Sequence, residues 1–393
     1  MICFLPAVAE NQPINKHRMN KELSSFAARL RELISHQPPA IGHRQFSELA
    51  LELFALQFQH NLAYRRICEV RNLTPQNVEH WIQIPAVPTA AFKELELSGI
   101  APAERTAVFH SSGTTEQKPS RHFHCPASLA LYEASLWAWF SRNLRLTIDD
   151  LQLPSGPALS EKSAIILTPP PVLAPHSSLV HMFEVVRQKF GRPESAFVGR
   201  IDSDGAWTLD FSAALAALKS AIVNPQSLTL LGTAFSFVHL LDFLAEKNLS
   251  FALPPGSRVM ETGGYKNRSR VLPKAELHAL ITERLSVPRE NIICEYGMSE
   301  LSSQAYEREV RSQKSEVRSF HFPPWARAQI ISPETGREVA GGETGLIRVF
   351  DLANVFSVAA IQTEDLAIRR GAGFELLGRA RVAEPRGCSL MSA

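Results

Sequence analysis

Short apolar runs alternate with segments of helical periodicity along the middle of the chain, and this alternation limits the possible folds more than any other feature. Apolar residues recur three and four positions apart in the segments 126–142, 181–190, 211–220, 235–246 and 274–285. Strand-like runs lie between them, at 163–167, 228–231, 258–260 and 292–295. Strands that alternate with helices indicate an α/β domain with a largely parallel sheet.

The regions on either side follow other patterns. Residues 20–78 have helical spacing, whereas from Arg327 onward short alternating strands are separated by Gly-rich turns and the helical period is absent. The sequence therefore predicts four parts. They are a helical N-terminal region packed on the core (1–105), an α/β core (106–325), a β-rich subdomain (326–380) and a flexible tail (381–393).

Charge and composition exclude several classes of protein. The chain has 393 residues, with 41 Lys and Arg against 39 Asp and Glu, so a net charge of +2 gives no reason to expect a nucleic-acid partner. No apolar run reaches the roughly 20 residues that a membrane span requires. The first residues do not resemble a signal peptide, and the five cysteines are scattered without a CxxC pair. We therefore expect a cytoplasmic protein.

The first segment with a chemical signal is a hydroxyl-rich loop. Ser111, Ser112, Thr114 and Thr115 surround Gly113. Small hydroxyl residues around a glycine allow backbone N–H groups and hydroxyls to converge on phosphate oxygens. The spacing differs from that of a Walker P-loop, and an ordinary solvated loop remains an alternative.

Two further segments are turns that follow strands. One contains Gly263 and Gly264, which permit close approach of the backbone to a ligand. The other runs from Tyr296 through Gly297 and Ser299 to Glu300. Ligands of open α/β sheets bind at the carboxyl ends of strands, where a Tyr can stack on a base and a Glu can hold Mg²⁺. Plain tight turns are the alternative for both.

The last two signals lie toward the C-terminus. Asp365 lies near a strand end and has the chemistry to accept both hydroxyls of a ribose, although a simple surface acid is the alternative. Cys388 lies near Arg379, Arg381 and Arg386, which favour the thiolate, the form that attacks an acyl carbonyl. An idle cysteine in a frayed tail is the alternative for Cys388.

The order of these segments resembles the adenylate-forming superfamily of acyl ligases and luciferases, and within it the acyl-protein synthetase (LuxE-type) family. The motifs that carry the closer resemblance are Val87–Lys93, Ser111–Thr115, Gly232–Phe235, Thr262–Lys266, Tyr296–Glu300 and Arg386–Ser389. The resemblance covers residue 80 to the end. It implies the large-domain fold of that superfamily, with layered α/β subdomains and a small β-rich subdomain. The chain ends shortly after Gly378-Arg379, where most relatives continue, so we expect no C-terminal lid domain and no lid lysine.

The resemblance also implies roles. Ser111, Ser112, Gly113, Thr114 and Thr115 would hold the triphosphate of ATP, Gly263, Gly264, Tyr296 and Gly297 would lie against adenine, and Ser299 would touch the α-phosphate. Glu300 would hold Mg²⁺, Asp365 the ribose, and Arg379 the ribose or phosphate. Lys266, Lys118 or Arg121, or else a partner, would replace the charge of the lid lysine. Cys388 would receive a long-chain fatty acyl group as a thioester and deliver it to a partner acyl reductase.

The sequence departs from the superfamily pattern at Glu116 and Gln117, where a glycine usually precedes the lysine of the loop. Two other functions therefore stay open. One is a ligase that passes the acyl group to coenzyme A or a carrier protein, for which Cys388 would be dispensable. The other is a non-catalytic acyl-binding or scaffold subunit of a reductase complex, which need not bind ATP.

Overall fold

A computed structural model describes residues 16–36, 41–111, 118–144, 146, 162–223, 227–264, 269–312 and 315–380, and the side chains of 16–20 and 310–317 are not described. Its principal helices are α1 (Lys16–Ser35), α2 (His43–His60), α3 (Leu62–Val70), α4 (Ala91–Glu94), α5 (Pro126–Asn143), α6 (Ser178–Phe190), α7 (Phe211–Val223), α8 (Ala234–Glu246) and α9 (Lys274–Leu285). Every helix within these ranges is too short or too polar to cross a lipid bilayer.

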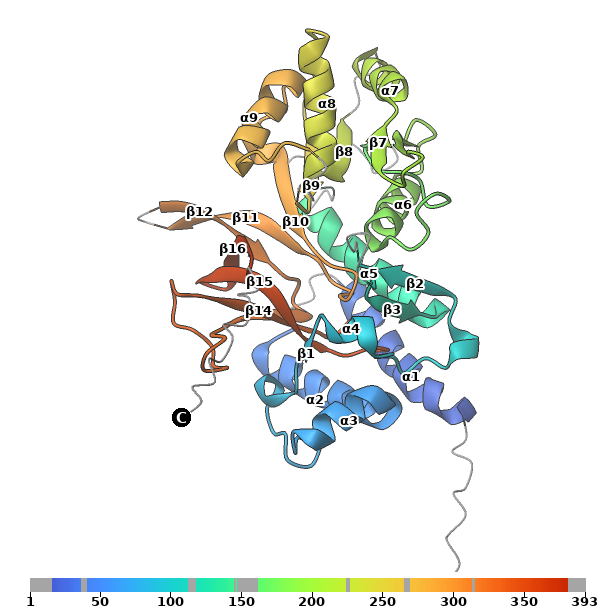
Figure 1. Cartoon of the computed structure of the whole chain (residues 1–393), viewed down its shortest axis with the longest axis vertical. Coiled ribbons are helices and arrows are strands. Elements are labelled where there is room, and N and C mark those ends of the chain that lie inside the picture. The colour runs from blue at the N-terminus through green and yellow to red at the C-terminus, as the bar shows by residue number, and fades with distance from the viewer. Residues whose placement is uncertain are drawn as a thin grey trace, which may run out of the picture.

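One large sheet forms the centre of the molecule (Figure 1). Its strands follow the order β13 (Ala326–Ile331), β14 (Thr344–Asp351), β15 (Ala360–Arg370), β16 (Gly373–Arg379), β12 (Ser315–His321), β11 (Ala305–Ser312), β10 (Ile292–Tyr296), β9 (Arg258–Thr262), β8 (Leu228–Thr233), β4 (Ser163–Ile166) and β5 (Ala196–Phe197). The short β1 (Val87–Pro88) pairs with β15. Two hairpins lie outside the sheet: β2 (Ala107–His110) with β3 (Arg121–His124), and β6 (Gly199–Ile201) with β7 (Trp207–Leu209).

The half of the sheet from β10 to β5 is parallel, and the half from β10 to β13 is antiparallel. Parallel strands require crossover connections, which are helices where the sequence predicts them. The predicted helix at 274–285 is α9 with the same bounds, and α5, α6, α7 and α8 cover the other predicted helices with ends shifted by a few residues. The largely parallel sheet is therefore confirmed for the α/β half of the chain.

Local sequence explains where several elements begin and end. Pro126 occupies the first turn of α5, where its missing N–H costs nothing. The Thr233 hydroxyl accepts from the backbone N–H of Ser236 and caps α8 immediately after β8. Gly191 ends α6 in the left-handed conformation, with φ of 66°. The carboxyl end of β8 thus passes directly into a capped helix.

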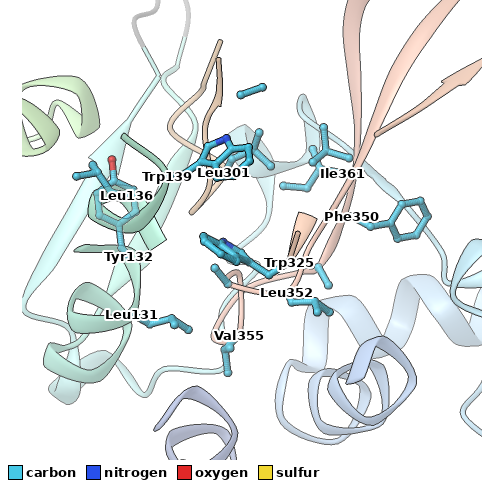
Figure 2. Packing of buried hydrophobic residues seen from close by; sticks show 14 of the residues in the cluster. Leu131, Tyr132, Leu136, Trp139, Leu301, Trp325, Phe350, Leu352, Val355 and Ile361 are labelled. Carbon is cyan, nitrogen blue, oxygen red and sulfur yellow. The ribbon is translucent and has the colours of Figure 1, made fainter. Parts of the chain in front are cut away.

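Two buried clusters hold the elements together. The smaller one lies between α7, α8, α9 and the β8–β9 side of the sheet. The larger one joins α1, α2 and α3 to α5 and to β10–β16. Figure 2 shows Trp325 at its centre, between Trp139 and Leu352. The Trp325 indole N–H donates to the Ser135 hydroxyl of α5 at 2.8 Å, which satisfies the polar atom of a fully buried ring. The N-terminal helices are therefore part of the same core as the antiparallel strands.

Candidate active site

The candidate site lies at the carboxyl ends of β8, β9 and β10 and draws on β15 from the antiparallel half (Figure 1). In the parallel register Thr233 is paired with Thr262, and Thr262 with Glu295. The turns after these strands therefore start at the same edge of the sheet, where open α/β sheets bind their ligands.

The ends of the hydroxyl-rich loop are fixed by the β2–β3 hairpin. The Ser111 N–H donates to the carbonyl of Ser120 at 3.4 Å, and the Ser120 N–H donates to the Ser111 hydroxyl at 3.0 Å. The predicted phosphate-binding residues Ser112, Gly113, Thr114 and Thr115 lie outside the described residues. The structure therefore shows where the two ends of the hydroxyl-rich loop lie.

The base of this loop meets the turn after β10. The hydroxyls of Ser120 and Ser299 are 3.4 Å apart, and the Ser299 hydroxyl donates to Oε2 of Glu300 at 3.0 Å. Ser120, Ser299 and Glu300 are all buried. Two of the segments singled out in the sequence are thereby joined, because Ser111 connects through Ser120 to Ser299 and Glu300.

His122 fixes the backbone of this turn, a contact that the sequence analysis missed. Its Nδ1 lies 2.8 Å from the carbonyl oxygen of Ser299, and since a carbonyl only accepts, Nδ1 carries the hydrogen. Burial lowers the His122 pKa to about 4, against a weaker opposing effect of this hydrogen bond. The imidazole is therefore neutral at pH 7 and acts as a donor to the turn.

Tyr296 and Asp365 are brought together from β10 and β15. The Tyr296 hydroxyl donates to Oδ2 of Asp365 at 2.8 Å, and burial, followed by the Asp365 charge, raises the Tyr296 pKa. The Tyr296 ring is buried and makes T-shaped contacts with the rings of Phe320, Phe322 and Phe374. The sequence analysis assigns this ring to base stacking, and in the fold its hydroxyl also orients Asp365.

Arg379 lies across the strand pair from Asp365. The two residues are paired in the β15–β16 register, and the guanidinium Nε is 3.5 Å from Oδ1 of Asp365. The Arg379 side chain is 81% exposed, whereas that of Asp365 is 14% exposed. Arg379 can therefore swing away and leave the carboxylate to a ligand at small energetic cost, because exposed ion pairs contribute little.

The glycine turn after β9 is open to solvent. Gly263 has a φ of +69°, a conformation that favours glycine, and a side chain at Gly263 or Gly264 would meet no atom within 4 Å. The open space beside this backbone permits the approach of a flat ligand. Lys266, the next predicted residue, lies outside the described residues.

Glu295 and Gly297 show why the second turn contains a glycine. A Cβ at Gly297 would overlap Oε1 of Glu295, so any side chain would displace that carboxyl group. The Thr262 hydroxyl of β9 donates to the same carboxyl group. Burial raises the Glu295 pKa to about 7, while the Thr262 hydrogen bond partly opposes this shift. Gly297 is thus required for packing within the turn.

Two buried polar residues, one at the end of β14 and one in the loop after it, hold the turn by hydrogen bonds, and the sequence analysis did not single them out. Asp351 accepts from the Ser302 N–H at 2.9 Å and from the Ser303 hydroxyl at 2.7 Å. The Asn354 amide donates to the Glu300 carbonyl at 2.8 Å. A polar residue within an apolar run such as Leu352–Val358 must find a partner, and that rule is the signal that could have identified Asn354.

The basic residues expected near a polyphosphate have acidic neighbours. Lys118 Nζ lies 3.4 Å from Glu94 Oε2, and Arg121 lies 3.6 Å from Glu96. Both pairs are partly or largely exposed.

Cys388, the predicted acyl acceptor, lies outside the described residues.

Comparisons with known proteins show what this chain is similar to. The profile of the family described as acyl-protein synthetase, LuxE, matches residues 186–393. The long-chain-fatty-acid–luciferin-component ligase of Aliivibrio fischeri is 23% identical over 368 residues, which cover 88% of this chain and 87% of that protein.

Solved structures are similar in fold. The crystal structure of 2-hydroxyisobutyryl-CoA ligase in complex with 2-HIB-AMP and CoA has a TM-score of 0.57 at 14% identity, over 88% of this chain and 73% of that one. The chain spans about half of the length (49%) of ATP-bound MatB from Rhodopseudomonas palustris, with a TM-score of 0.44 and 16% identity. The first of these likenesses confirms the predicted fold class, the α/β large-domain fold of adenylate-forming ligases.

Proposed function

The chain belongs to the acyl-protein synthetase (LuxE) family of enzymes, and we propose that it activates a long-chain fatty acid with ATP and transfers the acyl group to its own Cys388. The name of the Aliivibrio fischeri relative, a long-chain-fatty-acid ligase, supports this substrate class. The observation that carries the proposal is the polar connection from Ser111 through Ser120 to Ser299 and Glu300. It joins the hydroxyl-rich loop to the turn after β10 at the ligand-binding edge of the sheet.

The nucleoside would occupy the space between the β9 turn and β15. Gly263 and Gly264 leave the backbone open on that side, and the Asp365 carboxylate, oriented by Tyr296, would accept the two ribose hydroxyls. Arg379 would then move from Asp365 toward the ribose or the phosphates, which its exposure permits. Phe235, in the first turn of α8, is a candidate for the wall of the acyl pocket.

The phosphates would lie toward the serine residues. Ser111 to Thr115 would hold the triphosphate and Ser299 the α-phosphate, with Lys266 adding positive charge. The Glu300 carboxylate suits Mg²⁺, because it is buried and no basic side chain among the described residues pairs with it. Bound Mg²⁺ would offset the charge of the pyrophosphate that leaves.

The proposed reaction has two steps. The fatty carboxylate attacks the α-phosphorus of ATP, and the bond to pyrophosphate breaks, which leaves acyl-AMP. The Cys388 thiolate then attacks the acyl carbonyl and expels AMP, which forms the thioester. In the first step the protein positions the reactants and stabilises charge on phosphate oxygens. Delivery from Cys388 to a partner acyl reductase would follow. The ten residue-to-residue steps from Gly378 to Cys388 span roughly 33–36 Å at most when fully extended.

The Cys388→Ser variant separates the two steps. We expect it to retain fatty-acid-dependent exchange of pyrophosphate into ATP and to lose the acyl label that hydroxylamine or excess thiol releases. Cys68→Ser, a substitution of a buried cysteine in α3, serves as the matched control and should keep both activities. A Cys388→Ser protein that still accumulates a thiol-labile acyl group would refute the transfer step.

The same assay distinguishes the other two functions. If coenzyme A or a carrier protein is the true acceptor, its addition to Cys388→Ser should restore AMP release at the wild-type rate. If the chain is a non-catalytic subunit, neither protein should bind Mg-ATP or catalyse the exchange. We also propose that the chain is divided into four parts, at 1–105, 106–325, 326–380 and 381–393. The last part is the tail, which carries the acyl acceptor Cys388.

A further inference from the structure

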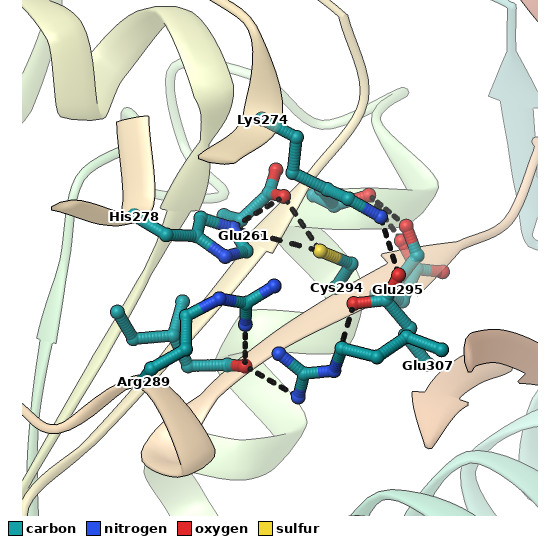
Figure 3. Close-up of polar contacts among 10 residues, drawn as sticks. Glu261, Lys274, His278, Arg289, Cys294, Glu295 and Glu307 are labelled. Atoms are coloured by element: carbon teal, nitrogen blue, oxygen red, sulfur yellow. Dashed lines mark hydrogen bonds and ion pairs between the residues drawn. The ribbon is translucent and has the colours of Figure 1, made fainter. Parts of the chain in front are cut away.

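A buried group of three side chains lies on the face of β9 and β10 that packs against α9. Glu261 and Cys294 are paired in the parallel register of these strands, and His278 of α9 faces them (Figure 3). Their neighbours Thr262 and Glu295 bond to each other instead. Because side chains alternate along a strand, the two pairs occupy opposite faces of the sheet.

The three side chains are in mutual contact. The Cys294 thiol donates to Oε1 of Glu261 at 2.8 Å, and its Sγ lies 3.7 Å from Nε2 of His278. The same His278 nitrogen lies 3.3 Å from Oε1 of Glu261. Their exposed fractions are 6% for Glu261, 0% for His278 and 3% for Cys294. A carboxylate, an imidazole and a thiol from three elements therefore point at one position inside the protein.

We propose that Glu261, His278 and Cys294 form a binding site for a transition-metal ion, Zn²⁺ by preference. Zn²⁺ accepts thiolate, imidazole and carboxylate ligands together, whereas Mg²⁺ and Ca²⁺ prefer oxygen ligands. Three protein ligands leave a fourth position for water or another donor. The site is separate from the proposed nucleotide site, so that its test is independent of acyl activation.

The separations of the ligand atoms fit a tetrahedral ion. Bonds of about 2.0–2.3 Å at tetrahedral angles place neighbouring ligand atoms about 3.3–3.6 Å apart. The distances of 3.3 Å from His278 to Glu261 and 3.7 Å from His278 to Cys294 already agree with this. The 2.8 Å contact between Glu261 and Cys294 is a hydrogen bond, and it would open by less than an ångström once the metal replaces the thiol proton.

The charges also balance. The Cys294 thiol holds its proton in the metal-free protein, since it donates to the Glu261 carboxylate. Coordination would displace that proton, and a thiolate with a carboxylate then neutralises a divalent ion inside the protein. The nearby Lys274 ammonium pairs with Glu307, a buried carboxylate that also lies 3.4 Å from Arg318. The positive charge beside the site is therefore already paired.

An ion at this position would connect the two strands that end in the site turns. Glu261 is two residues before Gly263, and Cys294 is two residues before Tyr296. Coordination would link both strands to α9 through the metal ion. The metal would thus fix the relative position of the glycine turn and the Tyr296 turn without contacting a substrate.

The test uses the full chain, freed of metal by a chelator and titrated with Co²⁺ and then with Zn²⁺. We expect a near-ultraviolet thiolate-to-cobalt band with one equivalent of Co²⁺, and its loss when Zn²⁺ displaces the cobalt. Cys294→Ser and His278→Gln should lose the band, or weaken cobalt binding at least tenfold. Cys68→Ser and Cys125→Ser, which change the other buried cysteines of the described ranges, should retain it.

A wild-type protein without the band, or a Cys294→Ser protein that keeps it, would overturn the proposal. Circular dichroism establishes that each variant is folded. Should both triad variants unfold, X-ray absorption of the zinc-loaded wild type decides, because the proposal requires one sulfur among lighter ligands. A zinc ion with only nitrogen and oxygen ligands contradicts it.

Discussion

Glu295 is the residue at which burial and charge conflict most directly in the candidate site. Its carboxyl group accepts from Thr262 and lies over Gly297, so it shapes the turn that carries Tyr296, Ser299 and Glu300. In the folded protein its pKa is about 7, raised by burial from an ordinary value of 4.5. A group whose pKa rises on folding binds more protons in the folded state between these two pH values.

The sign of this shift gives a prediction for Glu295→Gln. Between pH 4.5 and 7 the wild-type protein should lose stability from this group as the pH rises, because the unfolded carboxyl gives up its proton first. Glutamine does not titrate and can still accept from Thr262. The free energy of unfolding of the variant, minus that of the wild type, should therefore increase by up to about 3 kcal/mol over this range and then level off.

Urea denaturation at a series of pH values measures this difference. Glu246→Gln, which removes a carboxylate at the exposed end of α8, is the matched control against which the pH dependence for Glu295→Gln is compared. A pH-independent difference for Glu295→Gln would show that the carboxyl is not held in a desolvated environment.

At the scale of elements, the loop after β14 connects the N-terminal helices to the site turn. The Gln57 amide of α2 donates to the Asn354 carbonyl at 2.7 Å, and the Asn354 amide donates to the carbonyls of Glu300 and Val358. The Ser302 hydroxyl donates to Oδ1 of Asn354 at 2.6 Å. These residues are buried, so water cannot replace a lost partner without rearrangement. Hydrogen bonds through this loop therefore connect the α2 helix to the turn that carries Glu300.

Asn354→Ala tests this connection. It leaves the Glu300 carbonyl and the Ser302 hydroxyl without their partners, and we expect a loss of about 2–4 kcal/mol in the free energy of unfolding. Because the turn with Ser299 and Glu300 is loosened, the KM for ATP in the exchange assay should also rise several-fold.

The control for this prediction is Asn291→Ala, at the other end of β10. Its amide donates to the Ser257 carbonyl at 3.2 Å, far from the turns, so its loss should reduce stability and leave the KM for ATP unchanged. Equal effects of the two variants on the KM would mean that Asn354 matters for stability alone.

Part of the architecture could be predicted from the sequence, for physical reasons that particular elements show. The period of apolar residues identifies α9 to the residue and locates β8, β9 and β10, because buried parallel strands are continuous apolar runs. The hairpin of β11 and β12 was missed, since Ala305–His321 mixes charged and hydroxyl residues with few apolar ones. Local periodicity also cannot reveal that β12 pairs with β16, which joins both halves into one sheet.

In the candidate site, too, some residues could be predicted from the sequence and others could not. The turn residues are visible in the sequence because Gly, Ser and Tyr follow strand-like runs, and the structure brings Tyr296 next to Asp365. The partners His122, Asp351 and Asn354 were missed because they act from other segments, and only the tertiary fold places them under the turn. The enclosure of the Tyr296 ring by three phenylalanines was equally invisible, because these residues come from β12, the segment after it and β16.

At the scale of the whole molecule, the account depends on one nucleotide site built from separate segments of the chain. The measurement that tests it most directly is fatty-acid-dependent exchange of pyrophosphate into ATP, compared between Asp365→Ala and Asp242→Ala. Asp242 is also paired with an arginine, Arg270, but lies exposed on α8. We predict that Asp365→Ala raises the KM for ATP at least tenfold, through the loss of the ribose contact, and that Asp242→Ala leaves it unchanged. Equal KM values in the two variants and the wild type would contradict a nucleotide site at Asp365.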